Sequence, residues 1–254
     1  MYIGIDLGSR FVKIVYGAGL KNLLYKKINT IEFYKKYCKK KDSKFVLNLQ
    51  KLNIKSIGIN KITATGYGKN ITAFKDSKKI TEIEAHVYGI LNLFKHKNFT
   101  LLDIGGQDTK IINIRNRKIT DFSMNDKCAS GSGRYIENMS NIIGIPITEL
   151  GSYYKNPVNL SHTCAIFGES EVISSIVEGI SIQEIAGGIN YSVFKRIKKD
   201  LINYNNEKIV FTGGLAKNKA LAHYIKKELG KTVVIPDNPE YTGALGCFIN
   251  SKSN

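Results

Sequence analysis

Two cysteines lie in segments whose composition could support metal chemistry. Cys128 is followed directly by Ala-Ser-Gly-Ser-Gly, and Cys164 follows farther along the chain. A thiolate beside a glycine-rich loop can bind an iron–sulfur cluster, because small residues let backbone N–H groups approach the cluster sulfurs. The alternative is that both cysteines pack as small buried side chains, the commoner use of a free cysteine. Two thiols cannot complete a four-thiolate site, so a cluster would require a second copy of the chain.

Both cysteines precede segments with helical character. After Cys164, apolar residues recur at helical spacing from Ala165 to Val177, and Ser161, His162 and Thr163 are typical of a helix start. A helix N-terminus stabilises a nearby anion by about 0.3–1 kcal/mol, and it lowers the pKa of a thiol placed there. Both thiols are therefore expected near helix starts, where the thiolate form is favoured.

A second chemical pattern occurs twice. Asp-Leu-Gly-Ser-Arg-Phe-Val-Lys runs from Asp6 to Lys13, and Asp-Ile-Gly-Gly-Gln-Asp-Thr-Lys runs from Asp103 to Lys110. Alternating apolar residues flank each copy, which predicts a hairpin with a glycine-rich turn and a carboxylate at its entrance. Backbone N–H groups in such a turn can bind phosphate, and the aspartate can hold Mg²⁺ or its water. One such hairpin is often a plain turn, but the repeated pair predicts two turns that clamp a polyphosphate.

The elements that must position these residues follow from apolar periodicity. Strands are predicted over 54–62, 208–212 and 233–235, and helices over 79–94, 181–204, 215–229 and 241–249. Gly213 and Gly214 join the strand at 208–212 to the helix at 215–229, a junction at which a planar or phosphorylated ligand can lie against bare backbone. Glu82, Glu84 and His86 lie on the helix at 79–94, either as bases or ligands or as part of a solvated face.

The 254-residue chain carries a formal charge of +17 and is long enough for one large domain or two smaller ones. Such a charge can bind nucleic acid, but no recognised nucleic-acid-binding module accompanies it, so no nucleic-acid partner is expected. The densest lysine run lies between Lys35 and Lys44, and elsewhere lysine is scattered among many asparagines and isoleucines, which indicates compositional drift. Steering toward an acidic protein is the other interpretation.

No apolar run approaches the roughly 20 residues that a membrane span needs, and Met1 leads directly into a predicted strand. We therefore expect neither a membrane segment nor a signal peptide, and a cytoplasmic location. The four cysteines have no short spacing, which argues against a disulfide framework. Metal binding, catalysis and packing remain as their uses.

These motifs resemble those of the acetate and sugar kinase, Hsc70 and actin superfamily. The two Asp-Gly segments are similar to its phosphate motifs, and Gly213-Gly214 to its adenosine motif. Within the superfamily, the chain resembles the activators of 2-hydroxyacyl-CoA dehydratases along nearly its whole length. The segments that carry this resemblance are Thr65-Gly-Tyr-Gly, Thr81-Glu-Ile, Asn125 to Arg134, Thr163 to Ile173, Gly213 to Asn218 and Pro239 to Gly246.

The resemblance implies an α/β fold of two lobes like those of actin, Hsc70 and sugar kinases, built on duplicated RNase H-like subdomains with ATP in the cleft. The N-terminal lobe would cover 1–95, with the C-terminal helix at 241–250 packed back on it. The C-terminal lobe would cover 96–254 and contain a cluster-binding insertion at 124–180.

The resemblance also implies a homodimer that holds one [4Fe-4S] cluster, with Cys128 and Cys164 of each protomer as ligands. Cys38 and Cys247 lie outside the family's cysteine motifs and are expected to pack. The family couples ATP hydrolysis to injection of a low-potential electron into a 2-hydroxyacyl-CoA dehydratase or a related acyl-CoA reductase. A ferredoxin or flavodoxin is the implied electron donor.

The resemblance assigns the nucleotide pocket motif by motif. Asp6 and Asp103 are the candidates for organising Mg²⁺ and the attacking water. Asp108 and Glu82 are additional candidates. The assigned pocket residues are Asp6, Gly8, Ser9 and Lys13 in the first phosphate turn, Asp103, Gly105, Gly106 and Gln107 in the second, and Gly213, Gly214, Lys217 and Asn218 beside the adenosine.

Other functions remain open. A small-molecule or sugar kinase of the same fold would phosphorylate an acceptor and contain no iron. A nucleotide-gated scaffold would bind ATP and assemble without electron transfer. An ATPase that reduces a double-cubane cluster protein, or a benzoyl-CoA reductase-like assembly, fits the motifs almost as well as a dehydratase activator.

Overall fold

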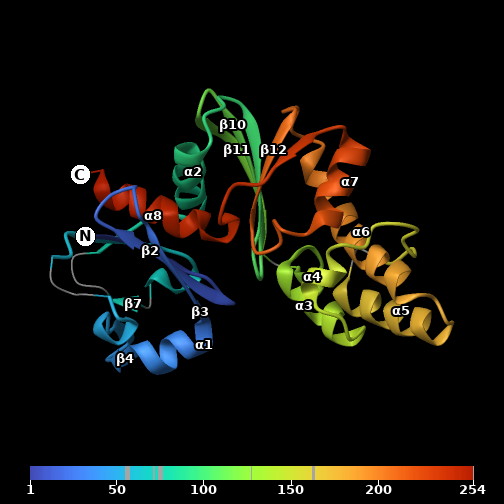
Figure 1. Ribbon diagram of the computed structural model, residues 1–254, viewed down its shortest axis with the longest axis horizontal. Helices are drawn as coiled ribbons and strands as arrows, with labels where there is room; N and C mark the ends of the chain where they lie inside the picture. The colour runs from blue at the N-terminus through green and yellow to red at the C-terminus, as the bar shows by residue number, and fades with distance from the viewer. Residues whose placement is uncertain (55–57, 71, 74–76, 127, 162–163, 254) are drawn as a thin grey trace. The chain divides into compact units, whose positions relative to one another are not determined.

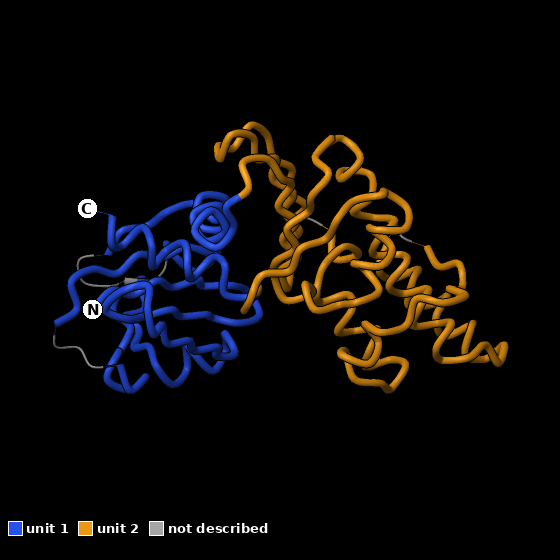
Figure 2. Tube along the Cα trace, turned by 45° about the horizontal axis from the view of Figure 1, so that its top comes forward, with its two compact units in different colours: residues 1–95, 240–254 blue, residues 96–239 orange. Residues whose placement is uncertain are grey.

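The computed structural model describes residues 1–54, 58–70, 72–73, 77–126, 128–161 and 164–253 (Figure 1). They form two compact units, residues 1–95 with 240–254 and residues 96–239 (Figure 2). Each unit contains a five-stranded sheet with both parallel and antiparallel pairs. The α/β class predicted from the sequence is therefore confirmed.

The sheet of the first unit has the strand order β3-β2-β1-β6-β8. Its strands are β1 (Tyr2–Leu7), β2 (Phe11–Gly17), β3 (Leu24–Asn29), β6 (Lys61–Thr65) and β8 (Ser77–Lys79). β1, β2 and β3 are antiparallel neighbours, whereas β6 and β8 add in parallel. The strand predicted over 54–62 is wrong in its bounds, because the described strand begins at Lys61 and residues 55–57 lie outside the described part of the chain.

Two helices, α2 (Glu82–Leu93) and α8 (Thr242–Lys252), pack against each other in this unit. The helix predicted over 79–94 begins at Glu82, since Thr81 and Glu84 form a capping box in which each side chain accepts a hydrogen bond from the other's backbone N–H. α8 packs on the sheet through Ala244, Leu245 and Phe248. The chain's C-terminal helix thus belongs to the same unit as its N-terminal strands.

The lysine-rich segment folds into structure that the sequence did not indicate. A small sheet of order β4-β5-β7 consists of β4 (Cys38–Lys41), β5 (Lys44–Leu47) and β7 (Thr72–Ala73). Short helical segments accompany it, namely α1 (Thr30–Glu32), η1 (Phe33–Tyr37), η2 (Gln50–Leu52) and η3 (Tyr67–Asn70). A hollow of about 580 Å³ lies between residues 39–41 and 46–50.

The sheet of the second unit repeats the pattern of the first. Its order is β11-β10-β9-β12-β13, with β9, β10 and β11 antiparallel and β12 and β13 parallel. The strands are β9 (Phe99–Ile104), β10 (Thr109–Arg115), β11 (Lys118–Asn125), β12 (Lys208–Gly213) and β13 (Thr232–Val234). Asp6 faces Lys13 in one hairpin, and Asp103 faces Lys110 in the other. The sequence repeat therefore corresponds to a structural repeat.

The described residues of the second unit form five α-helices, and the core lies between these helices and the sheet (Figure 1). They are α3 (Gly133–Ile142), α4 (Ile147–Leu150), α5 (Ala165–Val177), α6 (Ile182–Leu201) and α7 (Lys219–Leu229). The helix predicted over 181–204 is shorter at both ends, starting after the Ser181 cap and ending at Leu201. The helix predicted over 215–229 starts only at Lys219, because Asn218 caps it by accepting a hydrogen bond from Leu221 N–H.

The close crossing of α2 and α8 yields a stability prediction. A Cβ on Gly246 would overlap the carbonyl group of Ala85 on α2. We expect Gly246→Ala to lower the free energy of unfolding by about 1–3 kcal/mol or more, because backbone must move to admit the methyl group. Gly19→Ala is the control, since its methyl group would meet no heavy atom of the described residues within 4 Å. Chemical denaturation measures both, and equal stability of the two variants would contradict the close crossing.

Candidate functional site

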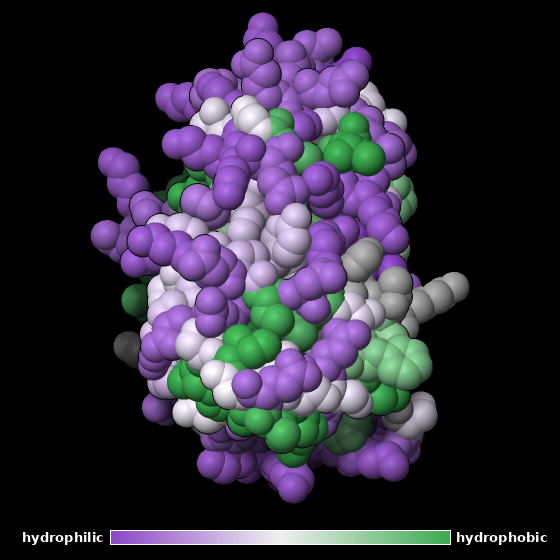
Figure 3. All heavy atoms as spheres, turned by 90° about the vertical axis from the view of Figure 1, so that its right-hand side faces the viewer, coloured by the Kyte–Doolittle hydropathy of each residue, from purple (hydrophilic) through white to green (hydrophobic). Residues whose placement is uncertain are grey.

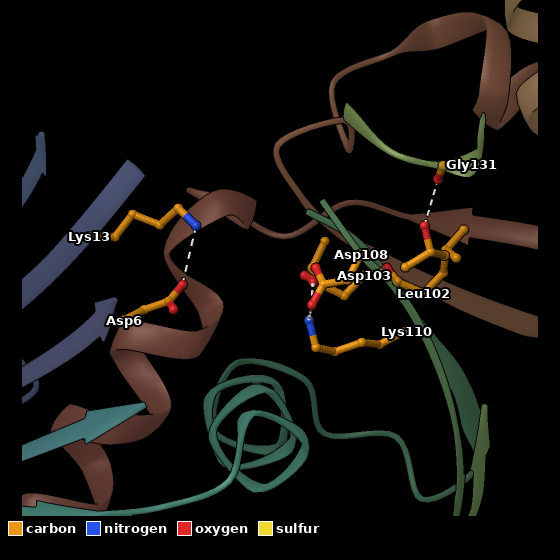
Figure 4. Close-up of polar contacts among 9 residues, drawn as sticks. Asp6, Lys13, Leu102, Asp103, Asp108, Lys110 and Gly131 are labelled. Atoms are coloured by element: carbon orange, nitrogen blue, oxygen red, sulfur yellow. Dashed lines mark hydrogen bonds and ion pairs between the residues drawn. The ribbon is translucent and has the colours of Figure 1, made fainter. Parts of the chain in front are cut away.

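The first predicted phosphate turn joins β1 to β2. Lys13 Nζ lies 3.2 Å from Asp6 Oδ2 (Figure 4), and Asp6 is buried. Gly8 and Ser9 are half-buried, so the turn remains accessible. Thr30 Oγ1 donates a 2.8 Å hydrogen bond to the Gly8 carbonyl, which fixes the turn from outside the hairpin. A Cβ on Gly8 would lie 2.8 Å from a backbone oxygen of the same turn, so this tight turn requires glycine.

The second predicted phosphate turn joins β9 to β10 and has a different electrostatic arrangement. Lys110 Nζ lies 2.6 Å from Asp108 Oδ2 and 4.0 Å from Asp103 Oδ2 (Figure 4). Thr212 Oγ1 donates a 2.8 Å hydrogen bond to Asp103 Oδ1, and Gly105 N–H donates one of 2.9 Å to the Asp108 carbonyl. The turn is therefore braced by a buried lysine and by a hydroxyl from β12. Neither Lys110 nor Thr212 was among the residues predicted for the site.

The predicted adenosine motif lies beside this second turn. β12 runs parallel to β9 so that Gly213 pairs with Ile104, and Leu215 N–H donates a 3.4 Å hydrogen bond to the Ile104 carbonyl. Gly213 has φ +89°, a left-handed conformation that favours glycine. Gly214 and Lys217 are exposed. The structure thus brings the glycine pair and the Asp103 turn together within one unit.

Asn218 has a clear structural use. Its Oδ1 accepts the capping hydrogen bond from Leu221 N–H at 3.0 Å, and its Nδ2 donates to Asn190 Oδ1 at 2.8 Å. Asn190 in turn donates to the carbonyls of Leu150 and Tyr153. Asn218, which was predicted to lie beside the adenosine, is therefore a buried residue whose side chain caps the start of α7.

Cys128 leads into a short 3₁₀ helix, η4 (Ala129–Gly131), and is only partly buried. Partial burial raises the pKa of its thiol, but hydrogen bonds from the hydroxyl and backbone N–H of Ser130 and the charge of Arg196 lower it by more, so the net pKa lies below its ordinary value. The Asn125 amide contacts both the N–H and the carbonyl of Cys128. Arg196 comes from α6, and nothing in the spacing of the sequence pointed to it.

Hydrogen bonds join the Cys128 loop to the second phosphate turn. Thr109 Oγ1 donates to the Gly131 carbonyl at 2.6 Å. Figure 4 draws this bond as the dashed line that ends at the labelled Gly131. The backbone N–H groups of Gly133 and Arg134 donate to the carbonyls of Gly105 and Gly106, each at 2.9 Å. The loop that carries Cys128 is therefore attached directly to the turn that carries Asp103.

Cys164 is the N-cap residue of α5 and is half-buried. Its position agrees with the predicted helix start, although His162 and Thr163 of that prediction lie outside the described residues. The first turn of α5 contacts the first turn of α3, since a Cβ on Gly168 would lie 2.7 Å from Tyr135 Oη. The helices that follow the two cysteines thus pack against each other.

The other candidates have different settings. Burial raises the pKa of the Cys38 thiol to about 11 and that of Cys247 well above its usual range, as expected of packed cysteines. Glu84 serves the capping box, and His86 is buried on α2. Gly243, at the start of α8, lies between His86 and Asp6, because its Cβ would be 3.0 Å from His86 Nε2 and 3.4 Å from Asp6 Oδ2.

The described residues contain neither a membrane-spanning helix nor a ready-made group of metal ligands. None of the helices they form is both long and apolar enough to span a membrane. In the same part of the chain, no group of three or more His, Cys, Asp and Glu side chains is arranged to hold a metal ion.

Comparison with known proteins gives consistent matches. The sequence profile of the BadF/BadG/BcrA/BcrD ATPase family matches residues 3–249. The 2-hydroxyisocaproyl-CoA dehydratase activator of Clostridioides difficile is 38% identical over 196 residues, which cover 75% of this chain and 73% of that protein. The (R)-2-hydroxyglutaryl-CoA dehydratase activating ATPase of Acidaminococcus fermentans is 36% identical over 194 residues, 73% of each chain.

A solved structure also matches almost the whole chain. The activator of the 2-hydroxyisocaproyl-CoA dehydratase from Clostridium difficile, with bound ADPNP, superimposes with a TM-score of 0.85 at 31% identity, over 98% of this chain and 93% of that one. This match confirms the actin-like ATPase fold predicted from the sequence.

The environment of Cys128 yields a pH prediction. Because hydrogen bonds and a positive charge stabilise its thiolate, alkylation of Cys128 by iodoacetamide should rise with a midpoint below the ordinary thiol value of 9.0. Cys38 should respond only near pH 11 and serves as the internal control. Peptide mass spectrometry of metal-free protein measures both thiols at once. Ser130→Ala should move the Cys128 midpoint upward, and a wild-type midpoint at or above 9.0 would contradict the described contacts.

Proposed function

Since the chain belongs to the BadF/BadG/BcrA/BcrD ATPase family, we propose that it hydrolyses ATP to drive a low-potential electron into a 2-hydroxyacyl-CoA dehydratase or a related acyl-CoA reductase. The observation that carries this proposal is the direct attachment of the Cys128 loop to the Asp103 turn. A nucleotide-binding turn and a thiol loop that share hydrogen bonds can respond to each other. Relatives named as dehydratase activators supply the class of partner.

The nucleotide is proposed to bind at the assigned glycine-rich turns. Because Gly105 N–H already donates to Asp108, the donors of the second turn that would meet phosphate are the N–H groups of Gly106 and Gln107. Asp6 and Asp103 would each hold Mg²⁺ or its water, and Asp103 would orient the attacking water. Thr212 fixes the rotamer of Asp103 through Oδ1, which leaves Oδ2 directed to the side of Lys110.

A [4Fe-4S] cluster is proposed to be held by Cys128 and Cys164 of two protomers, since such a cluster takes four thiolates. The residues fit this role in two respects. Both thiols are partly accessible at helix starts, and the pKa of Cys128 is lowered. The cluster would supply one-electron chemistry at low potential. Ser130, which contacts the Cys128 sulfur at 3.1 Å, would donate a hydrogen bond to a ligating thiolate and thereby influence the potential.

The surface of α5 supports the proposed dimer. Ile166, Phe167, Ile173, Ile176 and Val177 are 40–82% exposed on this helix, which Cys164 caps. Figure 3 views the molecule from the side of α5, and apolar side chains gather in the lower part of this face. Exposed apolar patches of this kind mark contact surfaces. A shared cluster requires the two protomers to meet beside Cys164. A second copy bound there would also cover the exposed apolar side chains of α5.

The remaining partners follow from the same proposal. The electron donor would be a ferredoxin or flavodoxin, and the acceptor the dehydratase or reductase. If the proposed function is rejected, the alternatives are a kinase of the same fold and a nucleotide-gated scaffold.

The cluster proposal predicts iron and acid-labile sulfide in anaerobically purified protein. Cys128→Ser and Cys164→Ser should each abolish most of the iron content and the visible absorption, because each removes two of four ligands from the dimer. Cys38→Ser is the matched control and should retain both signals. Iron-free wild-type protein, or full cluster spectra in both the Cys128 and the Cys164 variant, would reject the cluster proposal. The kinase and scaffold hypotheses would then remain.

The hydrolysis proposal predicts a different pattern. Asp103→Asn should lower ATP hydrolysis by about 100-fold or more, because the carboxylate charge that would meet Mg²⁺ and the attacking water is lost. Iron content should be unchanged. Asp121→Asn, an exposed carboxylate on β11, is the control and should hydrolyse ATP normally. Wild-type turnover by the Asp103 variant would remove Asp103 from the mechanism.

A further inference from the structure

We propose that Thr109 is a positioning residue whose hydroxyl transmits the state of the phosphate turn, residues 103–108, to the Cys128 loop, residues 128–131. The inference rests on the proposed function and deepens it, because it names the side chain through which nucleotide binding reaches the thiol. All of its parts lie within the second unit.

Thr109 occupies the junction between the two segments. It is the first residue of β10 and follows Asp108 directly. Its Oγ1 donates to the Gly131 carbonyl at 2.6 Å, and both residues are buried. A buried carbonyl that loses its donor is left unsatisfied, which is unfavourable, so the loop is held firmly to this hydroxyl. Movement of the end of the turn must therefore move Gly131 or break the bond.

The strand register carries the connection on to the thiol. Thr109 pairs with Asn125 across β10 and β11. The Asn125 side chain donates to the Cys128 carbonyl at 3.1 Å and accepts from the Cys128 N–H at 3.3 Å. The Cys128 loop is therefore fixed at one end by Asn125 and at the other by Thr109.

The turn itself contains a group that phosphate and Mg²⁺ would disturb. Lys110 is 2% exposed and is shared between Asp108 at 2.6 Å and Asp103 at 4.0 Å. A cation that binds Asp103 or Asp108 competes with the Lys110 ammonium for the same oxygens, and a phosphate attracts that ammonium. Either change shifts the segment from Asp108 to Lys110, and Thr109 lies between these two residues.

The other copy of the repeat shows that the hairpin does not require this hydroxyl. Val12 occupies the position that corresponds to Thr109, and it is fully buried in the core of the first unit. In both units the hairpin continues into a third antiparallel strand, but β3 leads into α1, whereas β11 leads into the Cys128 loop. Threonine and valine have similar shapes. The two repeats therefore differ at this position mainly by the Thr109 hydroxyl, which is the group that contacts the Cys128 loop.

Hydrogen–deuterium exchange of the full-length, anaerobically purified protein tests the inference, with ADP and the non-hydrolysable analogue adenylyl imidodiphosphate as probes. In wild-type protein, the analogue should slow exchange of the amides at 128–134 relative to ADP by a factor of roughly 5 or more, the lower end of typical coupling between sites. Thr109→Val should remove most of this difference while still binding the analogue, as measured by calorimetry. Thr109→Ser, which keeps the hydroxyl, should restore it.

Thr120→Val is the matched control. The Thr120 hydroxyl bonds to Asn113 within the same sheet, so this variant makes the same chemical change away from the loop and should behave as wild type. If Thr109→Val fails to fold, Thr109→Ala replaces it, since the smaller side chain also lacks the hydroxyl.

Three results would overturn the inference: a full nucleotide response in Thr109→Val or Thr109→Ala, a lost response in Thr109→Ser, or no response at 128–134 in wild-type protein that binds the analogue. The proposed function is judged separately by iron content and ATP hydrolysis. Protein that contains iron and hydrolyses ATP but shows no response at 128–134 would keep the proposed function and reject the role of Thr109.

Discussion

The burial of two opposite charges constrains the second unit. Asp103 and Lys110 are each only 2% exposed, and an unpaired charge in such a place costs several kcal/mol. β10 must therefore hold Lys110 within reach of Asp103 and Asp108, and β12 must place Thr212 against Asp103. A slip of one residue in either pairing would turn these side chains to the opposite face of the sheet. The register of three strands is thus set by polar contacts as well as by the apolar core.

Much of the fold could be predicted because local and tertiary preferences agree. The hairpins at Asp6 and Asp103 combine alternation with glycine turns, and α2 combines an apolar stripe with the Thr81 cap. The failures occur where these preferences conflict. Leu215 and Ala216 have side chains that favour a helix, but Leu215 N–H donates to the Ile104 carbonyl. The helix α7 therefore begins only after its N-cap residue, Asn218. The β4–β5 hairpin was not predicted, because its run of lysines lacks the alternation of apolar and polar residues that indicates a strand.

The candidate site was predicted in its residue types but not in its supporting contacts. Lys110 corresponds to Lys13 in the repeat, so its place beside a carboxylate could have been inferred from the sequence. Thr212 and Arg196 were not, because β12 and α6 bring them to the site from distant parts of the chain. Spacing along a sequence identifies a turn or a helix face, but it carries no information about which side chain arrives from another element. The electrostatics of Cys128 therefore depended on the fold.

The two repeats share a backbone, and their differences concern the lysine that faces each aspartate. In the first unit Lys13 meets Asp6 at 3.2 Å, and Phe11 stands where the second unit has Asp108. In the second unit Asp108 holds Lys110 at 2.6 Å and keeps it 4.0 Å from Asp103. Coulomb attraction falls with distance, and here it is also divided between two carboxylates, so Asp103 is less neutralised by its lysine than Asp6. This asymmetry favours Asp103 as the carboxylate that meets a cation, in the same unit and on the same hairpin that hold the Cys128 loop.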